Sequence, residues 1–282
     1  MTDKDFNKIY DLYIKCFPEY PAKRKLFFDL LELEKAVIIP AYEGGRLAGY
    51  SMIHGNSISL LCVDEEYRRK GIGSRLLEKS EEHIFNTGAN KIILGRGSRY
   101  ILQGVPDDNF SAVGFFKNKG YTAQWTSVNM SLDLADFSLN KLAIPPCPAD
   151  VVFRFAKEGE KEAVLKAVDD AQAGWHCIFE NCADPVFVAE WGGEIAGFEI
   201  LSPQGGRFVP AGETVGCVGC VGVIHKARNK GIGMQMVAHG IEWLKARGCT
   251  SIELRYVHLV DWYKKLGFKV IRHQWMGEKT RP

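Results

Sequence analysis

The chain has 282 residues, a formal net charge of +2, 46% hydrophobic residues and 25% charged residues. This length is typical of two domains, and the composition is typical of a soluble globular protein. The near-neutral charge argues against a dedicated nucleic-acid-binding protein. No apolar run is long enough to span a bilayer or has the form of a signal peptide. We therefore expect a cytoplasmic protein with neither nucleic acid nor membrane as a partner, and the oligomeric state stays open.

In the cytoplasm the eight cysteines are expected to be reduced thiols. Cys217 and Cys220 have the spacing of half a zinc site. They fall in a run that is predicted to be a strand, where residues three apart point to opposite faces. The sequence also offers no second cysteine or histidine pair at zinc spacing. We therefore predict that the protein has no metal site.

The first half of the chain predicts helices alternating with strands. The expected elements are helices at residues 6–16, 74–85 and 111–118, a hairpin around Gly44-Gly45, strands ending at Val63 and covering residues 91–94, and a last strand after Tyr121. A long loop, residues 97–109, interrupts this order. It is either a wall of an acceptor pocket or an ordinary surface loop.

A linker follows at residues 139–150, where Pro145, Pro146 and Pro148 exclude both helix and central strand. The second half then repeats the first in the same order. Its helices are expected at residues 160–171, 234–247 and 259–265, its hairpin at Gly192-Gly193, and its strands at 151–155, 214–223 and 251–255. The first repeat has no counterpart of the 151–155 strand, which is either missing or supplied from elsewhere. We expect domains at residues 1–138 and 151–282.

The most informative repeat is a basic, glycine-containing turn. Arg68-Arg69-Lys70-Gly71-Ile72-Gly73 returns 160 residues later (228 minus 68) as Arg228-Asn229-Lys230-Gly231-Ile232-Gly233. Each copy follows an apolar run and opens an amphipathic helix. Glycines allow close backbone approach, and the N–H groups at a helix start bind anions, so each turn is a candidate diphosphate cradle. The alternative is a tight turn with no role in binding. A dinucleotide fingerprint needs a third glycine, and Leu76 and Met236 stand there instead.

The chain resembles a tandem member of the GCN5-related N-acetyltransferase (GNAT) superfamily, over residues 5–135 and 151–278. The resemblance rests on R-x-x-G-x-G after a V-x-x-x-x-R strand, in Val63 to Gly73 and Val223 to Gly233. It is supported by two late helix motifs, residues 112–121 and 262–268. It implies an α+β fold of two tandem acyl-CoA N-acyltransferase domains, each a mixed twisted β-sheet flanked by helices.

The resemblance also implies acetyl-CoA (coenzyme A) as the cofactor, with its diphosphate on the turn and its pantetheine arm paired with the preceding strand. The residues that this implies for cofactor binding are Cys62, Val63, Arg68, Arg69, Lys70, Gly71, Ile72, Gly73 and Ser74 in the first repeat, and Val221, Val223, Arg228, Asn229, Lys230, Gly231, Ile232, Gly233 and Met234 in the second.

The two repeats differ in a residue that matters for acid catalysis. In the family a tyrosine four residues before the final glycine commonly protonates the leaving thiolate. Tyr263 stands at this position in the second repeat, whereas Phe116 takes its place in the first. Phenylalanine cannot donate a proton, so we expect the second repeat to be catalytic. Tyr263 as a packing residue is the alternative. The first repeat is left as a coenzyme A site without turnover, a site active through another residue, or a scaffold.

The general base is less well marked. Glu199 is a carboxylate in a run that otherwise predicts a buried strand, and Glu213 at the entry to the next strand is the runner-up. A solvent-facing strand position is the alternative for Glu199. His225 and His258 fit loop or surface roles equally well.

We expect an N-acetyltransferase that moves an acetyl group from acetyl-CoA to a primary amine. By analogy with the family, the acceptor is an amino sugar or another small amine. A protein or peptide amine is the alternative acceptor. A non-catalytic coenzyme A sensor is the alternative function, since both turns fit it equally well.

Overall fold

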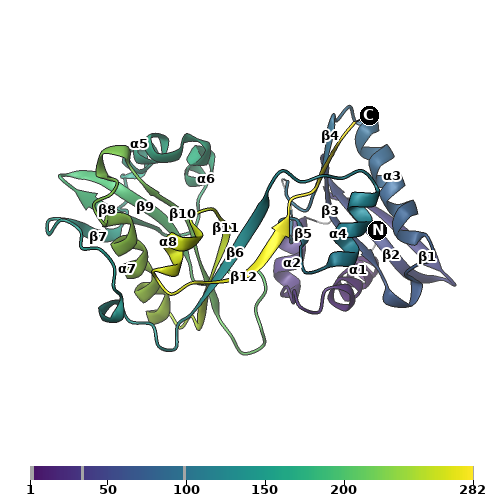
Figure 1. Cartoon of the computed structure of the whole chain (residues 1–282), viewed down its shortest axis with the longest axis horizontal. Helices are drawn as coiled ribbons and strands as arrows, with labels where there is room; N and C mark the ends of the chain where they lie inside the picture. The colour runs from purple at the N-terminus through teal and green to yellow at the C-terminus, as the bar shows by residue number, and fades with distance from the viewer. Residues whose placement is uncertain (1–2, 33–34, 98–99, 282) are drawn as a thin grey trace. The chain divides into compact units, whose positions relative to one another are not determined.

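The computed structural model describes residues 3–32, 35–97 and 100–281. The chain forms two compact units (Figure 1). Unit 1 comprises Met1–Ser127, Arg207–Pro210 and Arg272–Pro282, and unit 2 comprises Val128–Gly206 and Ala211–Ile271. The boundary between the two units therefore differs from the division at the linker that the repeats predict. Each unit includes segments from both repeats.

Unit 1 is a mixed sheet with helices on both faces. Its elements are α1 (Asp3–Cys16), α2 (Arg24–Leu31), β1 (Val37–Glu43), β2 (Arg46–His54), β3 (Ser57–Val63), α3 (Ile72–Asn86), β4 (Lys91–Leu94), β5 (Val105–Pro106), α4 (Phe110–Asn118) and β13 (Glu278–Thr280). The five-stranded sheet has the order β1-β2-β3-β4-β13. Among the described residues β1 is thus an edge strand, with no strand in the place of the one that precedes the hairpin in the second repeat.

Alternation along β3 divides the core of unit 1 into separate clusters. Leu60 and Cys62 pack with α1 and α2, whereas Leu61 and Val63 pack with the start of α3. Helix α3 buries the face that carries Ile72, Leu76, Leu77, Ser80 and Ile84, a spacing that follows the helical period. Burying one such leucine stabilises the fold by roughly 1.5–3 kcal/mol. The packing fixes where α3 begins relative to the end of β3.

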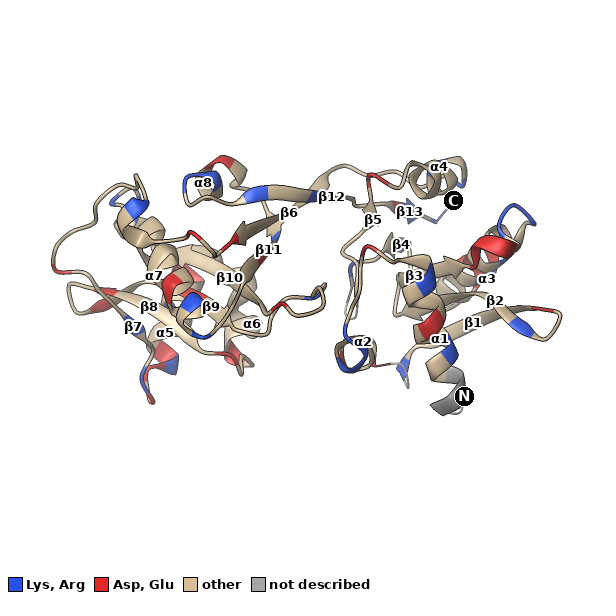
Figure 2. Cartoon of the chain, turned by 90° about the horizontal axis from the view of Figure 1, so that it is seen from below, with Lys and Arg blue, Asp and Glu red and all other residues tan. Residues whose placement is uncertain are grey.

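Unit 2 repeats this plan. Its elements are β6 (Thr126–Asp133, from Val128 on), β7 (Val152–Phe155), α5 (Lys161–Gln172), α6 (His176–Glu180), β8 (Val186–Trp191), β9 (Glu194–Ser202), β10 (Val215–Val223), α7 (Ile232–Ala246), β11 (Ser251–Val257), α8 (Val260–Lys264) and β12 (Lys269–Trp275, to Ile271). The strand order is β12-β6-β11-β10-β9-β8-β7. Helices α5 and α6 cover one face of the sheet and α7 the other (Figures 1 and 2).

Each unit takes a strand from the other half of the sequence. β6, which belongs to the first repeat, pairs antiparallel with β11 and aligns Ser251 with Asp133. β13, the last strand of the chain, pairs antiparallel with β4 and aligns Glu278 with Ile93. The short segment 207–210 also belongs to unit 1, where Phe208 pairs with Ala22. Each compact unit therefore contains segments from both halves of the sequence.

Charges are mixed over both units. Figure 2 shows basic and acidic residues interspersed along the elements of each unit, in keeping with the net charge of +2. In the ranges that the structure describes, no helix is long and apolar enough to cross a membrane.

Candidate active site

The basic turn has the same backbone conformation in both units. Gly71 and Gly231 have φ values of 79° and 76°, and the residues two before them, Arg69 and Asn229, have φ values of 63° and 60°. A left-handed conformation costs a residue with a side chain roughly 1–2 kcal/mol. It is kept at both turns, where the N–H groups of the first helical turn have no partner within the helix and can bind an anion that reaches them.

The first arginine of each motif braces the turn. Arg68 donates from Nε to the carbonyl of Val63 at 3.0 Å, and Arg228 donates to the carbonyl of Val223 at 3.1 Å. These guanidinium groups tie the turn to the end of the preceding strand. Arg69 and Lys70 follow Arg68 in the sequence. Both are exposed and place two cations beside the turn of unit 1.

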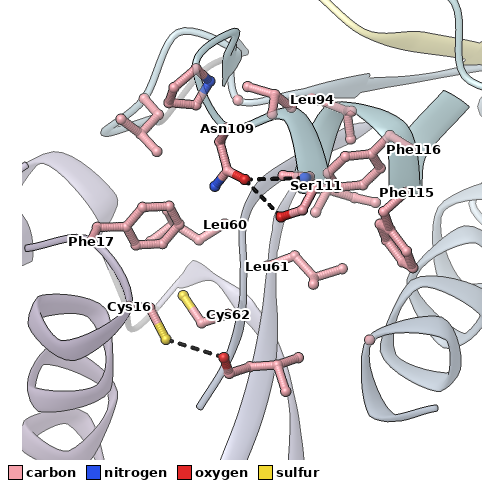
Figure 3. A pocket seen from close by; sticks show the side chains of 18 of the residues that line it. Cys16, Phe17, Leu60, Leu61, Cys62, Leu94, Asn109, Ser111, Phe115 and Phe116 are labelled. Carbon is pink, nitrogen blue, oxygen red and sulfur yellow. Dashed lines mark hydrogen bonds between the residues drawn. The ribbon is translucent and has the colours of Figure 1, made fainter. Parts of the chain in front are cut away.

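A cavity of about 520 Å³ opens beside the turn of unit 1 (Figure 3). It runs from the turn along β3 to the loop before α4. Its lining residues are Cys16, Phe17, Ile58, Ser59, Leu60, Leu61, Cys62, Val63, Arg68, Arg69, Gly71, Gly73, Ser74, Leu94, Gly95, Leu102, Gly104, Val105, Pro106, Asn109, Ser111, Ala112, Phe115 and Phe116. The predicted cofactor residues of the first repeat are brought together here, with Lys70 and the buried Ile72 outside the lining.

The cavity lies where β3 and β4 diverge. The parallel register joins Ser57 to Ile93 and Ile58 to Leu94, and β4 ends there while β3 continues to Val63. The backbone of residues 60–63 therefore faces the cavity. In unit 2, β10 and β11 are in register over residues 215–217 and 251–253 and then diverge. Each unit therefore has a pair of parallel strands that diverge beside its glycine turn.

The loop over residues 97–109 supplies one wall of the cavity, through Leu102, Gly104, Val105 and Asn109. Gly95 fits closely beneath it, since a Cβ there would lie 2.6 Å from the carbonyl oxygen of Leu102. Ser98 and Arg99 lie outside the described residues. The loop therefore lines a cavity, and its role as a wall of an acceptor pocket stays a prediction.

Most of the cavity wall is apolar, and the polar groups are few. Phe115 and Phe116 of α4 line the cavity, and neither side chain carries a hydroxyl group. Asn109 caps α4 by accepting hydrogen bonds from Ala112 N at 3.1 Å and Ser111 Oγ at 3.0 Å. These contacts occupy its side-chain oxygen.

Two thiols face each other in the cavity, Cys16 from α1 and Cys62 from β3 (Figure 3). Cys16 Sγ donates to the carbonyl of Val63 at 3.5 Å. Hydrogen bonding to Cys62, and then the charge of Arg68, lower the pKa of Cys16, whereas burial raises the pKa of Cys62. Cys16 is thus the more reactive thiol of the pair.

The corresponding turn of unit 2 is covered by the linker. A Cβ at Gly231 would lie 2.2 Å from the carbonyl oxygen of Pro146 and 3.1 Å from that of Pro145. Gln235, in the first turn of α7, donates to the same Pro145 carbonyl at 2.8 Å. Carbonyl oxygens are acceptors, so a diphosphate would have to displace them to reach this turn. Met234 is buried where its counterpart Ser74 lines the cavity of unit 1.

The predicted catalytic residues lie in unit 2. Tyr263, on α8, is half-buried against Trp262 and Phe268, and burial together with nearby Glu199 raises its pKa. Glu199 has no exposed surface, and burial raises its pKa to about 8. Its oxygen lies beneath α7, where a Cβ at Gly240 would approach it to 2.2 Å. Glu213 is exposed in the loop before β10. The structure therefore buries Glu199 beneath α7, half-buries Tyr263 on α8 and leaves Glu213 at the surface.

The sequence profile of the acetyltransferase (GNAT) family matches residues 6–121 and 151–268, most of the chain. The chain belongs to the acetyltransferase (GNAT) family. The two matched stretches correspond to the two repeats, and the two mixed sheets with their divergent strands are two tandem GNAT folds.

Solved structures of similar fold include other whole-length matches. One is the GCN5-related glucosamine N-acetyltransferase region of a fungal multi-domain GH3 β-N-acetylglucosaminidase, with a TM-score of 0.84 and 24% identity over 99% of this chain. The chain spans 37% of that protein. A GCN5-related N-acetyltransferase from Sphaerobacter thermophilus has a TM-score of 0.75 and 19% identity, covering 100% of this chain and 95% of its own.

A tandem GNAT protein from the clavulanic acid biosynthesis pathway has a TM-score of 0.72 and 14% identity, with coverage of 99% and 97%. At these identities the structural likeness establishes the fold. The tandem arrangement is thus shared over the full length of at least one other GNAT protein.

Proposed function

We propose that this acetyltransferase moves the acetyl group of acetyl-CoA to a primary amine, and that acetyl-CoA binds in the cavity of unit 1. The observation that carries the proposal is the continuity of that cavity, which joins the glycine turn to the divergent edge of β3. The sequence places the chemistry in the second repeat because of Tyr263. The linker over the second turn and the cavity at the first favour unit 1 instead.

The residues present suit this substrate. The N–H groups at the start of α3, with Arg69 and Ser74 beside them, are placed to hold the diphosphate. The backbone of residues 60–63, which β4 leaves unpaired, can pair with the amide groups of the pantetheine arm as an added strand would. Apolar walls from Leu94, Leu102 and Phe115 exclude water from the thioester.

We propose a small amine, such as an amino sugar, as the acceptor. The support is analogy with the fungal glucosamine N-acetyltransferase region, whose fold covers 99% of this chain. A coenzyme A sensor without turnover is the second candidate, and Phe116 in place of tyrosine favours it. Thiol release from acetyl-CoA with glucosamine, spermidine and a peptide amine separates the two. Binding of coenzyme A with no thiol release from any acceptor would favour the sensor.

Calorimetry of coenzyme A binding tests the location. Gly71→Val places a branched side chain in a left-handed turn residue, and we expect it to weaken binding at least about 10-fold. Ser74→Asp adds a carboxylate to the first turn of α3, which favours the helix but repels a diphosphate. We expect this variant to melt like wild type and to bind coenzyme A at least about 10-fold more weakly. Gly231→Val is the matched control. One site lost with Gly231→Val and retained in Ser74→Asp would place coenzyme A in unit 2.

A further inference from the structure

A serine that lines the cavity of unit 1 forms a hydrogen-bonded pair with a histidine. His54 Nδ1 lies 2.8 Å from Ser59 Oγ, and His54 Nε2 lies 2.6 Å from the carbonyl oxygen of Leu31 at the end of α2. Both side chains are buried, with 2% of Ser59 and 6% of His54 exposed. Ser59 nevertheless lines the cavity.

The two contacts determine the direction of the hydrogen bonds. A backbone carbonyl only accepts, so Nε2 of His54 carries a proton. In the neutral ring Nδ1 is then the acceptor, and the hydroxyl of Ser59 donates to it. If the ring takes up a second proton, both nitrogens donate, and the Leu31 carbonyl and the serine oxygen accept from the cation. The pair is therefore built to receive a proton through Ser59.

A β-bulge places Ser59 at this point. In the register of β2 with β3, Met52 pairs with Leu60 and Ile53 pairs with Ile58, so Ser59 is the extra residue. The bulge turns its side chain toward His54, on the α2 side. Ile58 is also the residue at which the pairing with β4 ends. Ser59 therefore stands where the two strands begin to diverge.

This position fits the reacting end of a bound acyl-CoA, an argument that rests on the proposed function. The diphosphate site lies at the turn that follows Val63, and the strand from Val63 back to Ser59 is about 13 Å long. A pantetheine arm laid along this edge runs from the turn toward Ser59. Its thioester then lies near the only part of β3 that combines a hydroxyl group with a histidine behind it among the residues that line the cavity.

We infer that Ser59 and His54 form the proton relay that deprotonates the acceptor amine, with Ser59 as the catalytic residue and His54 acting through it. The amine nitrogen attacks the thioester carbonyl carbon, the C–N bond forms and the C–S bond breaks. The nitrogen gives a proton to Ser59 Oγ as the hydroxyl proton of Ser59 passes to Nδ1 of His54. The imidazolium then returns its proton through the hydroxyl of Ser59 to the leaving thiolate, since Phe116 cannot donate one. The net result is transfer of one proton from the amine to the thiol, and no further reactant is needed.

The test compares three variants of the full chain. Ser59→Ala removes the relay hydroxyl and keeps the strand. His54→Asn leaves an oxygen that can accept from Ser59 but cannot take up a proton. Ser57→Ala is the matched control, because Ser57 is a buried serine of the same strand that donates to the carbonyl of Arg96 and does not line the cavity.

We expect Ser59→Ala and His54→Asn to lower kcat about 10²–10³-fold on whichever acceptor of the glucosamine, spermidine and peptide panel is used. Coenzyme A affinity, measured by calorimetry, should stay within about 2-fold, and Ser57→Ala should keep both values. Nitrogen-15 NMR of the free protein should show His54 protonated at Nε2 alone, with a changed Nδ1 signal in Ser59→Ala.

Three results would overturn the relay: wild-type kcat in Ser59→Ala, a parallel loss of kcat and coenzyme A affinity, or a neutral His54 protonated at Nδ1. A wild-type protein that binds coenzyme A yet releases no thiol with any acceptor would remove the proposed function and the relay with it. Turnover that is equal in wild type and both relay variants would remove the relay alone.

Discussion

Glu199 lies in the core of unit 2 with no exposed surface, and neither carboxyl oxygen has a hydrogen-bond partner among the described residues. Burial therefore raises the pKa of its side chain from 4.5 to about 8. The group is protonated at neutral pH in the folded protein and ionised in the unfolded chain. The contribution of protonated Glu199 to the free energy of unfolding is fully present below pH 4.5. It is lost as the pH rises to about 8.

Glu199→Gln removes this ionisation and keeps the shape of the side chain. We expect the variant to gain unfolding free energy relative to wild type as the pH rises, by about 3 kcal/mol between pH 4.5 and pH 7, because only the wild type must retain a proton. Chemical denaturation at pH 5, 7 and 8.5 measures the difference. A difference that does not change with pH would mean that Glu199 titrates alike in the folded and unfolded chains.

Cys16 offers a second test at the level of one residue. Hydrogen bonding to Cys62 and the charge of Arg68 lower the pKa of Cys16, and the thiolate is the reactive form. We expect iodoacetamide to modify Cys16 well before the buried Cys62. Coenzyme A should slow the modification at least about 5-fold if it fills the cavity. Peptide mapping by mass spectrometry measures both rates, and the exposed Cys177 of unit 2 is the control that coenzyme A should not protect. Equal protection of both cysteines would argue against a site beside Cys16.

Residues whose role depends on the partner strand could not be predicted from the sequence. Gly71 and Gly231 were predictable because a turn between strand and helix is a local pattern. Ser59 was not, because its direction depends on a bulge in the pairing with β2 and on the histidine that this pairing brings near. Glu199 stays a predicted base. A carboxylate in an apolar run is visible in the sequence, whereas the helix that covers it in the fold is not.

At the scale of elements the repeats predicted most of the helices and strands. The predicted strand over residues 91–94 is β4, and the helix over 74–85 is α3 with two more residues at its start and one at its end. The period of apolar residues determines these elements locally. Helices α2 and α6, which complete the faces of the two units, were not predicted. The pairing of strands across the repeats was not predicted either, because pairing is a long-range property.

The C-terminal strand, β13, shows how strand pairing across the repeats stabilises unit 1. β13 lies along β4, and its Glu278 exchanges backbone hydrogen bonds with Thr122 at 2.7 and 2.9 Å. The Glu278 side chain also forms ion pairs with Lys91 and Arg96. β4 supports one wall of the cavity through Leu94, so the last residues of the chain stabilise the site that we propose for coenzyme A.

We therefore expect a chain that ends at Gly277 to lose thermal stability in unit 1 and to bind coenzyme A more weakly, because β4 becomes an unpaired edge strand. Glu278→Gln is the matched variant. It keeps the backbone pairing and removes the partly exposed ion pairs, which are worth about 0–1 kcal/mol each. Calorimetry and thermal melting should show a small effect for the substitution and a large one for the truncation. Similar effects would assign the stability to the charges instead.

At the scale of the whole molecule, the two units of the duplicated chain differ in the surroundings of their glycine turns. Both turns keep the left-handed residues and the bracing arginine. The carbonyl oxygens of the linker then lie over the second turn, and the first opens into a cavity. The sequence could show the duplication but not this asymmetry, because the path of a proline-rich linker is decided by what it packs against. Phenylalanine at position 116 favours the second unit as the catalytic one, whereas the cavity at the first turn and the linker over the second favour the first.

The exchange of strands makes a prediction about folding. A fragment of residues 1–144 lacks β13 for the edge of β4, and a fragment of residues 145–282 lacks β6 for the edge of β11. Each fragment alone thus exposes a strand edge and part of a hydrophobic core, conditions that favour aggregation. We expect neither fragment to fold when expressed alone. Expressed together, they should form a stable complex that binds coenzyme A.

A protease site inserted between Pro146 and Pro148 provides the control, because cleavage after folding leaves every strand in place. The cleaved chain should run as one particle in size-exclusion chromatography and keep its coenzyme A affinity, since strand pairing holds each unit together without the peptide link. Separation of the two pieces after cleavage, or a folded and coenzyme-binding 1–144 fragment, would show that the exchanged strands are dispensable. Unit 1 would then be complete within the first repeat.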